Sequence, residues 1–203
     1  MAHQQSSLDA TAGPESFRAA VAAMRAAPLR PEVSCEEMPA PQRIAPWSTA
    51  LSADVTVDDT DLGTGRLILL HDPDGNVAWE GTFRCVAYVR AEVEHEVGND
   101  PLLGAVGWSW LTEALDAHGA AYHHASGSVT RVVTESYGHM ADEAPTAQVE
   151  IRASWSPQED EDGRVDMTAH VEAWGEVMCT AVGLEPVPDG VTAIPSRRGQ
   201  RGS

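Results

Sequence analysis

Residues 81–94, GTFRCVAYVRAEVE, alternate apolar and polar side chains along a single stretch. Every second residue belongs to an apolar set, namely Phe83, Cys85, Ala87, Val89, Ala91 and Val93. Most of the intervening positions carry arginine, tyrosine or glutamate. Because successive side chains of a β-strand point to opposite faces, this pattern predicts a strand with one buried face. In a sheet of such strands helices cover one face, and the other is left to solvent or to a ligand.

Further strand signals lie on both sides of this stretch. Residues 47–57 and 146–156 alternate in the same way, and RLILLH (66–71) reads as a short apolar strand. Residues 126–137 are rich in strand-forming residues, and DPDGN (72–76) is a strong turn signal. Since most of these segments follow one another through short turns, we expect a twisted antiparallel sheet of about five strands.

Three segments have the apolar spacing of helices. They run from Pro14 to Pro28, from Asp100 to Gly119 and from Asp166 to Gly183, each between residues that favour helix ends. Five prolines between residues 28 and 46 instead indicate an extended connector. The predicted fold class is therefore α+β, with three helices and the order α-β-β-β-α-β-β-α.

The 203 residues, 42% of them hydrophobic, suffice for one globular domain. We assign residues 14–186 to this single α+β domain. Residues 1–13 are small and polar and are expected to be disordered, and residues 187–203 are expected to form a flexible C-terminal tail.

The charge of the chain disfavours nucleic-acid partners. All 13 basic side chains are arginines, and the 31 acidic side chains leave a net charge of −18. Such a field repels phosphate backbones, so only the tail arginines Arg197, Arg198 and Arg201 speak for nucleic-acid binding. No stretch approaches the roughly 20 apolar residues of a membrane span.

The cysteines indicate a reducing compartment. Cys35, Cys85 and Cys179 are odd in number, far apart and without CxxC spacing, which argues against a disulfide framework or a zinc ribbon. The first residues contain no apolar run typical of a signal peptide. We therefore expect a cytoplasmic protein.

No motif of known chemistry stands out. His123 and His124 are adjacent, so on a strand they would point to opposite faces and would not converge on one metal ion. GTG (63–65) lacks the remainder of a nucleotide-binding loop, and neither HExxH nor GxSxG occurs. We accordingly predict no catalytic residues, no metal ligands and no cofactor.

The central helix carries apolar side chains over about 200°, a wider arc than one sheet requires. We expect Trp110 to face the sheet. An adjoining sector consists of Gly104, Trp108, Leu111 and Leu115. Exposed tryptophan is common at interfaces, so this sector is predicted to form a homodimer or partner surface. The alternative is that another helix of the same chain covers Trp108.

The expected core and the expected ligand face follow from the same strand alternation. The core is predicted to include Trp47, Leu51, Phe83, Val89, Trp110, Val149, Ile151 and Trp174. The candidate ligand face consists of Arg84, Tyr88, Arg90 and Arg152, which suit an acidic group or peptide. The alternative is cross-strand pairing of these arginines with glutamates such as Glu150.

Several longer stretches carry a family resemblance. They are PQRIAPWSTAL, GRLILLHDPDGNVAWEGTFR, VRAEVE, DPLLGAVGWSWL, QVEIRASWSP and AVGLEP. Through them the chain resembles DUF3000, an actinobacterial domain family of unknown function, over residues 15–186. The resemblance implies no catalytic residues. The predicted element order also resembles the type III secretion chaperone-like fold of YbjN-type proteins, which implies an acidic, dimeric protein that binds polypeptide segments.

These observations favour a non-enzymatic, chaperone-like adaptor that binds a protein or peptide and forms a homodimer. The alternative is an enzyme whose site uses scattered polar residues on the open sheet face. A deep pocket with converging His, Glu or Arg side chains would favour the enzyme, whereas a shallow groove would favour the adaptor.

Overall fold

The computed structural model describes residues 13–186, which contain a single six-stranded sheet. The strands are β1 (Val33–Met38), β2 (Trp47–Val57), β3 (Thr60–Asn76), β4 (Gly81–Val93), β5 (Tyr122–Thr134) and β6 (Thr146–Pro157). Their order across the sheet is β1-β2-β3-β4-β6-β5, and all neighbouring pairs are antiparallel. This confirms the predicted α+β class and the antiparallel sheet.

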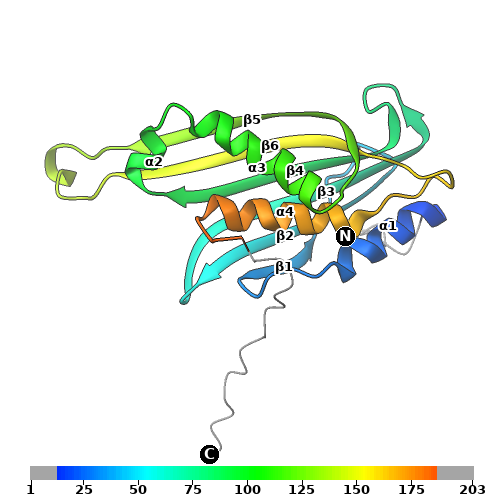
Figure 1. Ribbon diagram of the computed structural model, residues 1–203, viewed down its shortest axis with the longest axis horizontal. Coiled ribbons are helices and arrows are strands. Elements are labelled where there is room, and N and C mark those ends of the chain that lie inside the picture. The colour runs from blue at the N-terminus through cyan, green and yellow to red at the C-terminus, as the bar shows by residue number, and fades with distance from the viewer. Residues whose placement is uncertain (1–12, 187–203) are drawn as a thin grey trace, which may run out of the picture.

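Helices pack on one side of this sheet (Figure 1). They are α1 (Glu15–Ala26), α2 (His95–Asn99), α3 (Leu103–Ala117) and α4 (Met167–Ala181), and a 3-10 turn, η1 (Gly138–Met140), lies between β5 and β6. Helix α3 packs against β5 and α4, while α4 lies over β4 and β3. The opposite face of the central strands is left without a helix, as the alternation of residues 81–94 predicts.

The prediction of about five strands and three helices is one strand and one helix short. The additional strand, β1, lies within the proline-rich segment that was expected to be a connector. It pairs with β2 only, and of its six residues Val33 alone is buried, so its sequence carries almost no alternation. The additional helix, α2, is only five residues long. The turn after β3 also differs, because the strand continues through Asn76 and the chain turns at residues 77–80.

Most of the predicted core is confirmed. Six predicted residues are buried: Leu51, Phe83, Val89, Val149, Ile151 and Trp174. Trp47 and Trp110 are only partly buried, so their assignment to the core was wrong. Trp47 stands at the first position of β2, at the end of the sheet. Trp110 lies beside the buried stripe of α3 rather than on it.

Specific contacts position helix α4 on the sheet. A Cβ atom on Gly65 of β3 would lie 2.5 Å from Met178 Sδ, so the missing side chain lets α4 approach the strand. On β6, Trp155 Nε1 donates a hydrogen bond of 3.1 Å to His170 Nδ1 of α4, and both side chains are buried. Asp166 accepts a hydrogen bond from Ala169 N, which confirms the predicted N-cap of this helix.

Between residues 13 and 186, no helix combines the length and the apolar character that crossing a membrane requires. The predicted disordered N-terminus, Gly13 apart, and the predicted tail of residues 187–203 lie outside the described residues, as do Arg197, Arg198 and Arg201.

Candidate functional site

The helix-free face of the sheet carries a row of three large side chains across β3, β4 and β6. Tyr88 of β4 is in register with Arg66 of β3 on one side and with Arg152 of β6 on the other. Since side chains at paired positions project from the same face, Arg66, Tyr88 and Arg152 lie side by side across the three strands. We call these three residues the arginine–tyrosine row.

Contacts hold one half of this row in place. The Arg152 guanidinium lies 5.6 Å from the centre of the Tyr88 ring, within the range of a cation–π contact. Arg152 Nη2 also lies 2.8 Å from Glu150 Oε2, while the Tyr88 hydroxyl donates to Glu150 Oε1 at 3.2 Å. Burial and the Glu150 carboxylate raise the pKa of Tyr88 above its ordinary value, so the hydroxyl remains a donor.

The other half of the row is open. Arg66 is exposed, and its side chain takes part in no hydrogen bond or ion pair within residues 13–186. The sequence pattern does not point to Arg66, because RLILLH has the character of a short apolar strand that begins at this residue. Extending the alternation from Leu67 and Leu69 would have placed Arg66 on the outer face. Arg90, one step along β4, donates through Nε to Gln148 Oε1 at 3.0 Å.

Arg84 does not belong with the other predicted ligand-binding residues. Only 9% of it is exposed, and its guanidinium is engaged in four hydrogen bonds. Nη1 donates to the His124 carbonyl and to Ser156 Oγ, both at 3.0 Å, and Nη2 donates to Ser154 Oγ at 2.7 Å and Ser126 Oγ at 3.4 Å. Burial lowers the pKa of Arg84 from its ordinary value. The sequence pattern placed it on the correct face but could not show that other residues cover it.

The turn between β3 and β4 is tied to two of the residues that bind Arg84. The Trp79 carbonyl accepts a 2.6 Å hydrogen bond from Ser156 Oγ, and Glu80 Oε1 lies 3.1 Å from His124 Nε2. These bonds hold the turn against the ends of β5 and β6. Tyr88 and Arg152 remain on the open part of the face, whereas Arg84 is buried among its hydrogen-bond partners on β5 and β6.

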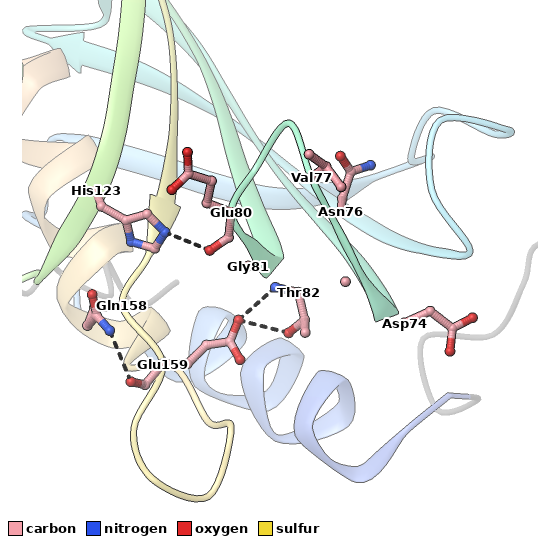
Figure 2. Close-up of a pocket in the computed structure, with 10 residues that line it drawn as sticks. Asp74, Asn76, Val77, Glu80, Gly81, Thr82, His123, Gln158 and Glu159 are labelled. Carbon is pink, nitrogen blue, oxygen red and sulfur yellow. Dashed lines mark hydrogen bonds between the residues drawn. The ribbon is translucent and has the colours of Figure 1, made fainter.

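A cleft of about 530 Å³ lies beside the same turn (Figure 2). Glu159 accepts hydrogen bonds from Thr82 N at 2.7 Å and from Thr82 Oγ1 at 2.9 Å. His123 Nε2 lies 3.2 Å from the Glu80 carbonyl and donates to it. The cleft is shallow and acidic, and its polar groups bond largely to one another. In the part of the chain that the structure describes, no group of three His, Cys, Asp or Glu residues is arranged to hold a metal ion.

The predicted partner surface on α3 is divided by the fold. The buried residues of this helix are Leu103, Gly107, Leu111, Ala114 and Leu115. Leu111 and Leu115 are therefore core residues and cannot contact a second subunit in this fold. Trp108 and Trp110 lie at the two borders of the buried stripe, which is why both are partly buried.

Trp108 rests on the sheet of its own chain. A Cβ atom on Gly127 of β5 would lie 2.7 Å from Trp108 Cζ3, so the ring covers the position of the missing side chain. Neither a helix nor a partner is needed to explain its burial. Gly104, the first of the four predicted residues, has open space beside it, because an added Cβ would meet no atom outside its own helix within 4 Å.

Comparison with known proteins gives one match. A family model described as "Protein of unknown function (DUF3000)" matches residues 13–192. No curated protein and no solved structure matches the chain.

Proposed function

The chain belongs to the DUF3000 family, whose description assigns no activity, and from its surfaces we propose that it is a non-enzymatic binding protein. In this proposal the helix-free sheet face holds an acidic segment of another polypeptide. The three cysteines of the chain are free, which supports a cytoplasmic location as part of the same proposal.

The observation that carries this proposal is the arginine–tyrosine row. A guanidinium group binds a carboxylate through two parallel hydrogen bonds, and Arg66 has both of its donor edges free within the described chain. The Tyr88 ring adjoins it and offers apolar contact to the stem of a bound side chain. Arg18 and Arg43 are likewise exposed and without a side-chain partner among the described residues, but of these three arginines only Arg66 is in register with Tyr88 on the sheet face.

The cleft beside the turn between β3 and β4 gives the enzyme alternative less support. General acid–base chemistry needs groups that face a substrate, whereas Glu159 is bonded to Thr82 and His123 to the Glu80 carbonyl. The cleft also lies beside the turn rather than in a deep cavity. The adaptor is thus the function that this geometry favours.

Peptide binding tests the proposal directly. The probe is a fluorescein-labelled peptide of alternating glutamate and leucine, followed by fluorescence anisotropy, with its glutamine–leucine counterpart as a second probe. We expect the acidic peptide to bind and Arg66→Ala to weaken its binding by about tenfold, because one charge-assisted bidentate contact is lost.

Arg164→Ala is the matched control, since Arg164 is an exposed loop arginine outside this face and its removal changes the net charge equally. Its affinity for the acidic peptide should equal that of the parent protein. Equal losses in both variants, or equal binding of the two peptides by the parent, would show that the arginine–tyrosine row does not recognise carboxylates.

A further inference from the structure

We propose that the free edge of β5 pairs with β5 of a second copy of this chain, so that one continuous antiparallel sheet runs through a two-fold symmetric dimer. The β5 edge adjoins the arginine–tyrosine row, because Ser128 pairs with Arg152, but the inference does not depend on the proposed function.

Strand β5 presents a long unpaired edge. It has 13 residues and is the last strand of the sheet, where β6 is its sole strand partner among the described residues. Figure 1 shows β5 along the outer margin of the sheet, with α3 over its face rather than along its edge. An exposed edge of this length offers unpaired backbone N–H and C=O groups to another strand.

The opposite edge of the sheet is protected, and β5 is not. Strand β1 is short, carries Glu36 and Glu37, and is followed by Pro39 and Pro41. Acidic residues, short length and proline are devices that prevent edge pairing. Strand β5 contains neither proline nor an acidic residue, and its irregular register is confined to the stretch between His123 and Ser126.

The charge of β5 permits a second copy as the occupant, although the net charge of the molecule opposes self-association elsewhere. Two molecules of net charge −18 repel each other over most of their surfaces. The β5 strand, YHHASGSVTRVVT, has Arg131 as its one arginine and is a place where two copies can meet without opposing carboxylates. Arg131 Nη1 donates to the Asp100 carbonyl of its own chain. This hydrogen bond holds the Arg131 guanidinium on the face of the sheet that the helices cover.

Exposed apolar side chains are concentrated in β5, in the turn after it and in the two helices that contact it. Of the eight large hydrophobic residues that are exposed between positions 13 and 186, six belong to the α2–α3 region or to the β5–η1 region. They are Val97, Leu102, Val106, Val132, Tyr137 and Met140. Since α3 packs against β5, pairing the two β5 edges would bring the α3 helices of both copies together, and part of this apolar surface would be covered.

The test places a negative charge at the middle of the edge strand. Ser128 is the central residue of β5, so in a symmetric pair it lies close to its own counterpart. Within the chain it pairs with Arg152, so Ser128→Glu has a favourable neighbour and should fold. We expect the parent to sediment at twice 21.6 kDa and Ser128→Glu to raise the dimer dissociation constant by at least about tenfold.

Ser52→Glu is the matched control. Ser52 lies in β2, also opposite an arginine, Arg66, and remote from β5. Its dissociation constant should equal that of the parent. Hydrogen exchange adds an independent measurement. Among residues 126–134, the amides that point away from β6 should become protected as the parent is concentrated and should lose this protection in Ser128→Glu.

Three results would overturn the proposal. One is a parent that remains at 21.6 kDa at millimolar concentration. Another is a dimer that Ser128→Glu and Ser52→Glu affect equally. The third is exchange of the β5 amides that does not depend on protein concentration.

Discussion

At the scale of single residues, Gly127 determines how closely α3 approaches the outer strand. An added Cβ would lie 2.7 Å from Trp108 Cζ3 and 3.0 Å from Ala153 Cα, and would also meet the Arg152 carbonyl oxygen. The tryptophan that suggested a partner surface is thus accommodated by one glycine, 19 positions later in the chain.

We predict that Gly127→Ala lowers the free energy of unfolding by about 1–3 kcal/mol, because the methyl group overlaps both a ring and a backbone. Gly104→Ala should raise it by about 0.5–1 kcal/mol, because alanine favours the helix and meets no atom there. Urea unfolding of both variants beside the parent measures these changes. A neutral Gly127→Ala would mean that Trp108 does not pack on β5 as described.

At the scale of elements, Arg84 joins three strands and a turn. It extends from β4 to Ser154 and Ser156 of β6 and to Ser126 and the His124 carbonyl of β5. Ser156 in turn holds the Trp79 carbonyl. His124 has a positive φ of 52° at the irregular part of β5, and its carbonyl is one of the groups that Arg84 binds.

We expect Arg84→Lys to lower the free energy of unfolding by about 1–3 kcal/mol. A lysine ammonium keeps the charge but cannot replace two branches of a planar guanidinium, so buried hydroxyl groups lose their donors. Arg66→Lys is the control, and should change stability by no more than about 0.5 kcal/mol because Arg66 is exposed. Similar changes in both variants would show that the Arg84 network contributes little to joining these strands.

At the scale of the whole molecule, the helix layer and the sheet meet at a buried histidine. His170 of α4 is 1% exposed, accepts a hydrogen bond from Trp155 Nε1, and has its pKa lowered to about 4, chiefly by burial. His71, buried 4.1 Å from the Phe83 ring centre, also has a pKa lowered by burial. Both imidazoles are held in their neutral forms.

The lowered pKa of His170 predicts acid sensitivity of the whole fold. The unfolded chain takes up a proton near the ordinary pKa of 6.5, and the folded chain only near 4, so protonation favours unfolding across that interval. The contribution of His170 is present above pH 6.5 and decreases as the pH falls towards 4, by about 3 kcal/mol in total.

Urea unfolding at several pH values between these limits tests this. In His170→Gln the fall in stability with decreasing pH should be smaller than in the parent, while the exposed His139→Gln should follow the parent. Identical pH dependence in the parent and His170→Gln would contradict a neutral, buried His170.

The sequence by itself determined those features that depend on residues close together in the chain, namely strand alternation and helix starts. Alternation over residues 81–94 predicts β4 and its buried face, and Pro14 and Asp166 mark helix starts that the structure confirms. These signals are readable because strand periodicity and helix capping act over a few residues. The family resemblance and the net charge are likewise properties of the sequence alone.

Only the tertiary structure decided which surfaces remain available. Arg66, Tyr88 and Arg152 form one row because β3, β4 and β6 pair in a particular register, and the Tyr88–Glu150 contact joins residues 62 positions apart. Arg84 has the same alternation as Tyr88, yet it is buried, with hydrogen bonds to serines of β5 and β6 that lie 42 to 72 positions away. The edge strands β1 and β5 are only partly buried, so the alternation of apolar and polar residues along them is weak. Register, burial and free edges depend on contacts between remote segments, which local patterns do not specify.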